Sequence, residues 1–329
     1  MNDRPGQLDE SLVRIAEAYD ELPYESKPFP QTHPARTGAI AHLFGLSRVP
    51  LERARVLELG CAAGGNIIPI AARYPDARFL GIDLGLKQVE EGRERVARAG
   101  LGNIEIRHQS ITDLGAEEGE FDYIICHGVY SWVPEPVREA ILAICGRHLS
   151  AEGIACVSYN VSPGWRLYQP LRDAFRLLIP GNHPPATRVK MARQLLDFMK
   201  EVSPDRGSYG DMLRASPARL ARYGDDYLFH DYMEEENMPT SISDFMSAAS
   251  RHGLGYLGEC DIDLMIASNF GEDFAQRLAA RMTPDVLSYE QMIDVLTGRP
   301  FRSTLIVRQE RVGLHMADVE QLLAILHRL

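Results

Sequence analysis

Short apolar runs alternate with amphipathic segments between residues 50 and 160, and this alternation constrains the fold more than any other feature of the chain. Strands that follow one another through helices imply a parallel sheet covered on both faces. Ligands bind such sheets beyond the carboxyl ends of the strands. The pattern predicts strands at 55–59, 78–83, 104–107, 121–126 and 153–159, and helices at 67–74, about 87–99 and about 134–148.

Two later segments extend the same pattern: a helix at 243–252 that turns into a strand at 253–259, and a last strand at 301–308. The alternative is a separate helical domain that ends in a hairpin. We therefore predict a Rossmann-like, doubly wound, mostly parallel α/β fold with a helical insertion. Its expected parts are an N-terminal lid or substrate segment (1–50), the core (51–165), a helical insertion for substrate recognition or dimerisation (166–240), the completion of the core or a regulatory domain (241–310) and a C-terminal helix (311–329).

Composition limits the partners and the compartment. The formal net charge of −11 argues against attachment to nucleic-acid backbones, which needs clustered basic residues. No stretch approaches the roughly 18 consecutive apolar residues of a membrane span, and no signal pattern opens the chain, so we expect a cytoplasmic protein with no membrane partner. The five cysteines never form close pairs, which predicts buried free thiols and no metal site.

A glycine-containing loop, Glu58-Leu59-Gly60-Cys61-Ala62-Ala63-Gly64-Gly65-Asn66, follows the first predicted strand. Gly60 and Gly64 permit a backbone that wraps closely around a ligand. Asp83 closes the next strand, where a carboxylate can accept hydrogen bonds from both hydroxyls of a ribose. Glu58 would repel a pyrophosphate but attract the ammonium group of S-adenosylmethionine. The loop therefore favours S-adenosylmethionine over a nicotinamide dinucleotide, although Asp83 could instead be an exposed strand-end carboxylate.

These motifs resemble those of class I S-adenosylmethionine-dependent methyltransferases, with Gly81-Ile82-Asp83-Leu84 as the second motif and Gln109-Ser110-Ile111 after the third strand. The resemblance implies that Glu58, Gly60 and Gly64 hold the methionine portion, Asp83 the ribose, and Ser110 with Ile111 the adenine. It implies S-adenosylhomocysteine as the product and no metal. The alternative for Ser110 is a turn residue, since the usual acid is absent. Further expected cofactor contacts are Cys61, Ala62, Asn66, Leu84, Gln88 and His127.

Longer motifs resemble a bacterial subgroup that carries a regulatory domain and includes protein-lysine methyltransferases of rickettsial outer-membrane protein. The resemblance spans about residues 18–310 and implies methylation of a protein lysine, in a subgroup whose larger members continue into a further C-terminal region. Two other functions stay open: methylation of a small metabolite or natural product at nitrogen or oxygen, and a catalytically silent cofactor-binding or dimerising subunit. The motifs lie at 24–34, 127–134, 160–165, 229–234 and 251–259.

Direct displacement at a sulfonium carbon needs alignment and a nucleophile with a free lone pair. A lysine amine, with a pKa near ~10.4, must first lose its proton, which an apolar aromatic site promotes. His127 is the candidate general base, Tyr130 is a second catalytic candidate, and both could instead be structural. A purely packing role is the alternative for four of the expected acceptor contacts: Trp132, Trp165, Tyr24 and Phe29. The expected acceptor contacts are Tyr24, Phe29, His33, Tyr130, Trp132, Tyr159, Asn160 and Trp165.

Overall fold

A computed structural model describes residues 13, 21–23, 25–204, 207–281 and 285–314. The chain divides into two compact units. The larger unit comprises residues 26–165 and 238–329, and the smaller unit comprises residues 1–25 and 166–237. The predicted C-terminal helix at 317–329 and the acceptor candidate Tyr24 lie outside the described residues.

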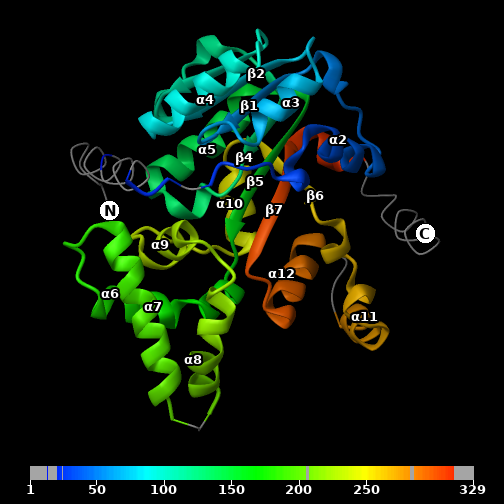
Figure 1. The fold of residues 1–329 in the computed structure, drawn as a ribbon. Helices are drawn as coiled ribbons and strands as arrows, with labels where there is room; N and C mark the ends of the chain where they lie inside the picture. The colour runs from blue at the N-terminus through cyan, green and yellow to red at the C-terminus, as the bar shows by residue number, and fades with distance from the viewer. Residues whose placement is uncertain (1–12, 14–20, 24, 205–206, 282–284, 315–329) are drawn as a thin grey trace. The chain divides into compact units, whose positions relative to one another are not determined.

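The larger unit is built on a seven-stranded sheet with the order β3-β2-β1-β4-β5-β7-β6 (Figure 1). The first five strands are parallel, and β7 runs antiparallel to both of its neighbours. This confirms the doubly wound, mostly parallel α/β class. The alternative of a separate domain ending in a hairpin is wrong, because the last two strands complete the same sheet. The strands are β1 (Arg55–Leu59), β2 (Arg78–Asp83), β3 (Ile104–His108), β4 (Phe121–Cys126), β5 (Leu149–Asn160), β6 (Leu254–Glu259) and β7 (Phe301–Arg308).

Helices cover both faces of this sheet (Figure 1). One apolar core joins α2, α3 and α4 to the strand side chains of one face, including Val56, Ile125 and Cys156. On the other face, α5 and α10 pack together and against the sheet, where Phe245 of α10 stacks on Tyr159 of β5. The helices of this unit are α2 (Pro34–Leu43), α3 (Ile67–Arg73), α4 (Leu86–Arg98), α5 (Glu135–His148), α10 (Ile242–Ser250), α11 (Glu272–Ala279) and α12 (Val286–Thr297).

The ends of two elements show how local sequence sets the boundaries. Helix α4 stops just before Gly100, which takes φ = 64°, a left-handed conformation that ends helices and favours glycine. Strand β5 begins at Leu149, earlier than the predicted residue 153, because Leu149 pairs with Phe121 before a register shift. The polar residues of that irregular stretch conceal the start of the strand from the hydrophobic pattern.

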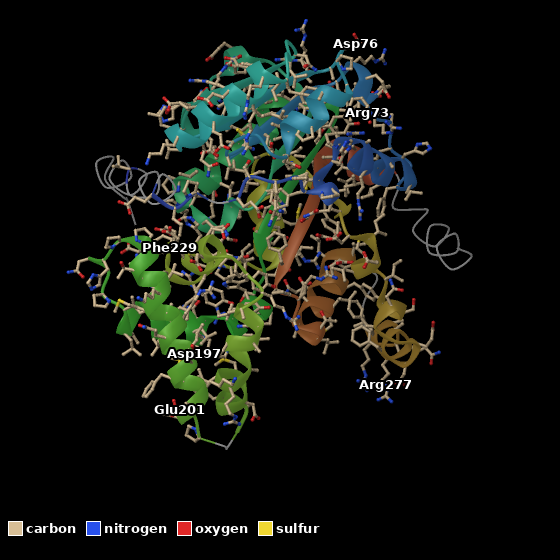
Figure 2. All side chains as sticks on the ribbon, in the orientation of Figure 1. Arg73, Asp76, Asp197, Glu201, Phe229 and Arg277 are labelled. Atoms are coloured by element: carbon tan, nitrogen blue, oxygen red, sulfur yellow. The ribbon has the colours of Figure 1, made fainter. Side chains whose placement is uncertain are left out.

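The smaller unit is helical and has a core of its own, in which Phe229 is buried. Its long helix α7 turns Asp197 and Glu201 to the solvent (Figure 2). The buried guanidinium of Arg172 donates to main-chain carbonyls after and within the last turn of α9, which satisfies groups that a helix end leaves unpaired. The helices are α6 (Gln169–Leu178), α7 (Pro185–Val202), α8 (Gly207–Leu220) and α9 (Asp225–Met233). Among the described residues, none of the helices combines the length and apolarity that a bilayer crossing requires.

Candidate cofactor and acceptor site

The sheet places the predicted carboxylates on one face, at the carboxyl ends of neighbouring strands. Glu58 of β1 pairs with Gly81 of β2 and with Ile125 of β4. Because alternate side chains of a strand point to the same face, Asp83 and His127, two positions further along their chains, share the face of Glu58. The site candidates therefore converge where ligands bind in this fold class.

Asn160 at the end of β5 belongs to the same face. It pairs with Phe301 of β7, whose ring lies 5.7 Å from the ring of His127, centroid to centroid. Ser158, two positions earlier in β5, accepts a hydrogen bond from the backbone N–H of Gly128 at 2.8 Å. The structure thus brings His127, Asn160 and Phe301 together, although the sequence indicated Phe301 merely as part of a strand.

The loop after β1 has the wrapped backbone that its glycines predict. Gly60, Ala62 and Gly64 all take positive φ, at 72°, 48° and 71°. A Cβ on Gly60 would lie 2.4 Å from Cγ2 of Val129, so this position excludes a side chain. For an alanine, positive φ is uncommon and is typical of functional sites. The loop therefore has a backbone with positive φ at three positions, which glycine permits at two of them.

Glu58 is buried beneath this loop and has one unused oxygen. Its Oε1 accepts from Nδ2 of Asn66 at 2.7 Å, whereas its Oε2 is buried without a hydrogen-bond partner among the described residues. Burial, helped by the nearby charge of Asp83 and opposed by the Asn66 hydrogen bond, raises the pKa of Glu58 to about 8. A buried acceptor of this kind fits the positively charged group of a ligand.

Asp83 is partly exposed and lies across the loop from Glu58. Its Oδ2 accepts from the backbone N–H of Ala62 at 2.7 Å, and its Oδ1 accepts from that of Gly85 at 2.8 Å. Burial raises the pKa of Asp83, although these backbone donors oppose the shift. Each carboxylate oxygen can accept a second hydrogen bond, so the same group can hold the loop and receive two ligand hydroxyls.

Residues 26–33, which end in a short 3-10 helix at Pro30–Thr32, contact the glycine loop, and we call them the N-terminal strap. Ser26 Oγ accepts from the backbone N–H of Gly65 at 2.8 Å, and the backbone N–H of Phe29 donates to Oδ1 of Asn66 at 2.9 Å. Asn66 also donates to Thr32 Oγ1 at 3.1 Å. A Cβ on Gly65 would lie 2.3 Å from the carbonyl of Ser26. Ser26 and Thr32 were not among the predicted site residues, because both are short polar residues in a segment without periodicity.

His127 lies between aromatic rings from two distant parts of the chain. The ring of Phe29 in the strap is 4.2 Å from it and that of Phe301 is 5.7 Å away, centroid to centroid. Its Nδ1 is buried and has no hydrogen-bond partner among the described residues. Burial lowers the pKa of His127 to about 4, so the imidazole is neutral near pH 7. An imidazole with so low a pKa is a weak proton acceptor, which favours a hydrogen-bonding role over the general base that the sequence suggested.

Tyr130 and Tyr159 lie on the opposite face of the sheet. Both rings pack against Phe245 of α10, at centroid distances of 5.3 and 4.3 Å, and against each other at 6.2 Å. The hydroxyls of Tyr159 and Thr304 are hydrogen-bonded at 3.0 Å, and burial raises the pKa of Tyr130 to about 12. Trp132 and Trp165 likewise pack edge to face at 5.9 Å. These contacts favour the packing alternative for all four residues.

The remaining candidates lie around the loop and the strand ends. Ser110 precedes a 3-10 turn, and its Oγ accepts from the backbone N–H of Thr112 at 3.3 Å, which favours the turn alternative. His33 is the N-cap of α2, and its Nδ1 accepts from the backbone N–H of Ala35 at 3.1 Å. Ile111 and Leu84 are partly exposed, Gln88 is buried in α4, and Cys61 is buried in the loop.

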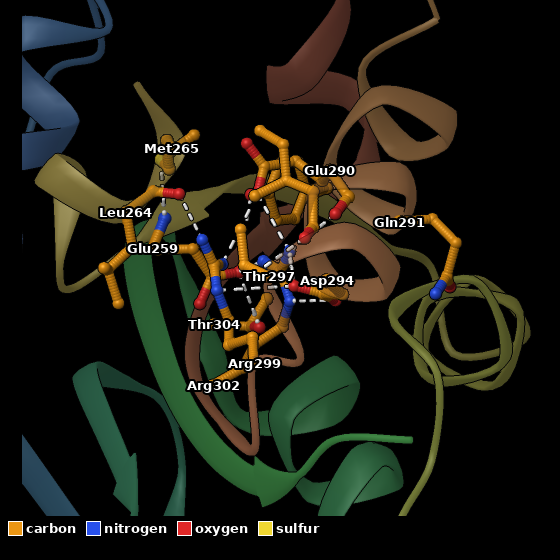
Figure 3. A network of polar contacts seen from close by, with 12 residues as sticks. Glu259, Leu264, Met265, Glu290, Gln291, Asp294, Thr297, Arg299, Arg302 and Thr304 are labelled. Carbon is orange, nitrogen blue, oxygen red and sulfur yellow. Dashed lines mark hydrogen bonds and ion pairs between the residues drawn. The ribbon is translucent and has the colours of Figure 1, made fainter. Parts of the chain in front are cut away.

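A buried ionic network supports the other face of the sheet near Tyr159 (Figure 3). Arg302 of β7 forms ion pairs with Glu259 of β6 at 2.6 Å and with Glu290 and Asp294 of α12 at 2.9 and 2.8 Å. Arg299 is a second cation within 3.3 to 3.6 Å of the α12 carboxylates. Glu259 lies 43 positions from Arg302 in sequence, and Glu290 and Asp294 lie 12 and 8 positions from it. No motif in the sequence indicated that these residues form a network. Across the described parts of the chain, no cluster of His, Cys, Asp and Glu has the composition of a metal site.

Two families match separate parts of the chain. Residues 56–153 match a family described as "Methyltransferase domain", and residues 224–308 match one described as "Predicted methyltransferase regulatory domain". The first stretch contains the glycine loop, Asp83 and His127. The second contains β6, β7 and the ionic network.

Rickettsial proteins are similar along most of the chain. "Uncharacterized protein RP789" of Rickettsia prowazekii is 42% identical over 89% of this chain and 53% of its own length. "Uncharacterized protein RP028" of the same organism is 34% identical over 71% of this chain and 94% of its own length. The structure of PKMT2 from Rickettsia typhi in complex with AdoHcy superposes with a TM-score of 0.79 at 36% identity, over 88% of this chain and 55% of that one. The chain thus spans about half the length of RP789 and of PKMT2.

Proposed function

The chain belongs to the class I S-adenosylmethionine-dependent methyltransferases, and we propose that it methylates the side-chain amine of a protein lysine. The cofactor part of this proposal rests on Oε2 of Glu58, which is buried and has no hydrogen-bond partner among the described residues. A carboxylate oxygen without a partner is costly to bury, and the ammonium group of a methionine moiety would satisfy it.

The other residues of the loop fit the same cofactor. Gly60 and Gly64 keep the backbone open to close approach, and Asp83 has acceptor capacity left for two ribose hydroxyls. Ser110 and Ile111 stay proposed as neighbours of the adenine. When bound, S-adenosylmethionine supplies a methyl group on a sulfonium centre. The protein's own part is to orient the acceptor, exclude water and keep the attacking lone pair free.

Two observations support an amine as the acceptor. The longer motifs resemble those of rickettsial protein-lysine methyltransferases, and the apolar rings of Phe29 and Phe301 lie 4.2 and 5.7 Å from the ring of His127. An apolar environment disfavours an ammonium ion and so promotes the neutral amine that can attack.

Transfer of label tests the proposal directly. The purified unmodified chain and the purified Glu58→Gln variant are each incubated with radiolabelled S-adenosylmethionine. Each incubation also contains either bacterial lysate or a small-metabolite extract. The control is Glu94→Gln, an exposed carboxylate on α4. We expect label on lysines of protein bands with the unmodified chain and the control. Label confined to small molecules supports the metabolite alternative, and cofactor binding without transfer supports a silent subunit; either result contradicts the proposal.

The finer statements about partners stay predictions of the sequence: a possible homodimer, no nucleic-acid or membrane partner, and a cytoplasmic location. Sedimentation of the purified chain tests the first. A single species at the monomer mass would contradict a homodimer.

A further inference from the structure

Besides Oε2 of Glu58, two buried polar atoms on the same face of the sheet have no hydrogen-bond partner among the described residues. They are Nδ1 of His127 and Nδ2 of Asn160. The main chain of Asn160 is fully used, since its N–H donates to Ser131 Oγ at 2.8 Å and its carbonyl accepts from Thr240 at 3.0 Å. Leaving a buried polar atom unsatisfied costs about 1–3 kcal/mol, so native proteins rarely do so outside functional sites.

The two side chains are brought together by the strand register. Asn160 pairs directly with Phe301, and Phe301 contacts His127 edge to face. Phe29 of the strap also packs against the His127 ring, at a centroid distance of 4.2 Å. Phe301 thus links Asn160 to His127, whose ring has two aromatic neighbours.

We propose that His127 and Asn160 form an acceptor-binding pair that holds the attacking nitrogen of an uncharged primary amine. This inference rests on the proposed function and adds the residues that orient the acceptor. One N–H of the amine donates to Nδ1 of His127. The second donates to Oδ1 of Asn160, which a 180° rotation of the amide brings to the position of Nδ2. The nitrogen lone pair is then left free.

The transfer step balances without a protein base. The nitrogen lone pair forms the new N–C bond while the C–S bond breaks, and its electron pair stays on sulfur in S-adenosylhomocysteine. The methylated product is an ammonium ion that loses a proton to water. His127 stays neutral throughout, because burial holds its pKa near 4 and neither Phe29 nor Phe301 carries charge. It is thus a positioning hydrogen-bond acceptor.

Three substitutions at one position distinguish this role from packing. The amide of His127→Asn has an oxygen near the position of Nδ1, that of His127→Gln reaches toward Nε2, and His127→Leu keeps bulk without an acceptor. We expect His127→Leu and His127→Gln to lower kcat/KM for a lysine peptide by ~100-fold, the scale of a misoriented nucleophile, and His127→Asn to restore most of it. Calorimetry with S-adenosylhomocysteine separates this role from the cofactor contact expected of His127, since a cofactor contact would weaken the affinity of the variants and an acceptor contact would not.

Asn160→Ala should lower kcat/KM in the same way, and Asn160→Asp should lower it less because the carboxylate still accepts. The matched control is Ser162→Ala, which is close in sequence. Equal kcat/KM in His127→Leu and the unmodified chain would overturn the proposal. So would equal losses in His127→Leu and His127→Asn.

A binding measurement on the unmodified chain keeps the test independent of turnover and of variant folding. Protein with 15N-labelled histidine is saturated with S-adenosylhomocysteine and titrated with n-butylamine near the amine's own pKa of about 10.4. We expect the Nδ1 resonance of His127 to shift, and n-butanol at equal concentration to shift it less. An unchanged resonance would overturn the pair. Absence of methyl transfer together with a clear shift would instead contradict the proposed function.

Discussion

The side-chain amide of Asn66 donates to Oε1 of Glu58 at 2.7 Å and accepts from the N-terminal strap through its own oxygen. One amide thereby links the buried carboxylate to the segment that covers the glycine loop. It also leaves Oε2 of Glu58 without a partner among the described residues. We therefore expect the ionisation of Glu58 and the binding of a ligand at the glycine loop to affect each other.

Ligand affinity should depend on pH through Glu58. With a pKa of about 8, the carboxyl group is largely protonated at pH 6 in the free protein, and a ligand ammonium favours the ionised form. We expect affinity for S-adenosylhomocysteine to rise between about pH 6 and 8, by up to tenfold per pH unit. Glu58→Gln should abolish this slope and weaken binding at pH 8 by ~1.5–3 kcal/mol. Calorimetry measures both, and a slope retained in Glu58→Gln contradicts the coupling.

The same group should destabilise the ligand-free protein at high pH. The folded-state pKa of about 8 lies above the ordinary value of 4.5, so the folded protein binds more protons between those values. The contribution of Glu58 to the free energy of unfolding therefore falls as pH rises through this range. Urea unfolding should show ligand-free Glu58→Gln more stable than the unmodified chain at pH 9, with a smaller difference at pH 5. The exposed control Glu94→Gln should show no such divergence.

Asp83→Ala should weaken S-adenosylhomocysteine binding by ~1.5–3 kcal/mol, the scale of lost charge-assisted hydrogen bonds. The backbone N–H groups of Ala62 and Gly85 also lose their acceptor, so a modest fall in thermal stability should accompany this loss. An analogue without ribose hydroxyls separates the two effects. It should bind the unmodified chain more weakly than S-adenosylhomocysteine does, yet bind Asp83→Ala as tightly as S-adenosylhomocysteine binds that variant. If the affinity lost through the substitution and the affinity lost through the missing hydroxyls simply add, Asp83 does not contact the ribose.

Tyr130→Phe should leave turnover within about twofold of the unmodified chain. The Tyr130 ring packs against Tyr159 and Phe245, on the opposite face of the sheet from His127, and phenylalanine retains those ring contacts. Steady-state kinetics with a lysine peptide check this. A tenfold fall in kcat with unchanged cofactor affinity would contradict this and would indicate that the hydroxyl of Tyr130 contacts the acceptor.

The sequence predicted the parts of the site that depend on local chemistry. The glycines and Glu58 follow a recognisable strand, and Asp83 ends the next one, so strand order alone brings them together. The sequence could not show on which face of the sheet a residue lies once its strand has ended. His127 and Tyr130 are three residues apart, yet they lie on opposite faces. That separation depends on the packing of α10 and the strap, which are contributed by distant segments.

Long-range contacts account for most of what the sequence did not predict. Phe301 reaches His127 because β7 inserts between β5 and β6, an order that hydrophobic periodicity cannot reveal. Ser26 contacts Gly65 across 39 positions of the chain. Neither pair has a local signal, since each residue alone is unremarkable in its own segment.

Arg302→Met should lower the free energy of unfolding by ~3–5 kcal/mol. Its guanidinium is fully buried and faces Glu259, Glu290 and Asp294, so its removal leaves three buried carboxylates with Arg299 as their neighbouring cation. Urea unfolding measures the effect.

The matched control is Arg277→Met on α11, whose ion pair with Asp273 is largely exposed (Figure 2). An exposed pair contributes about 0–1 kcal/mol, so this variant should unfold almost as the unmodified chain does. Adding Glu259→Gln to Arg302→Met removes one of the uncompensated carboxylates and should recover part of the lost stability. If the double variant is less stable than Arg302→Met, charge burial is not what the network balances.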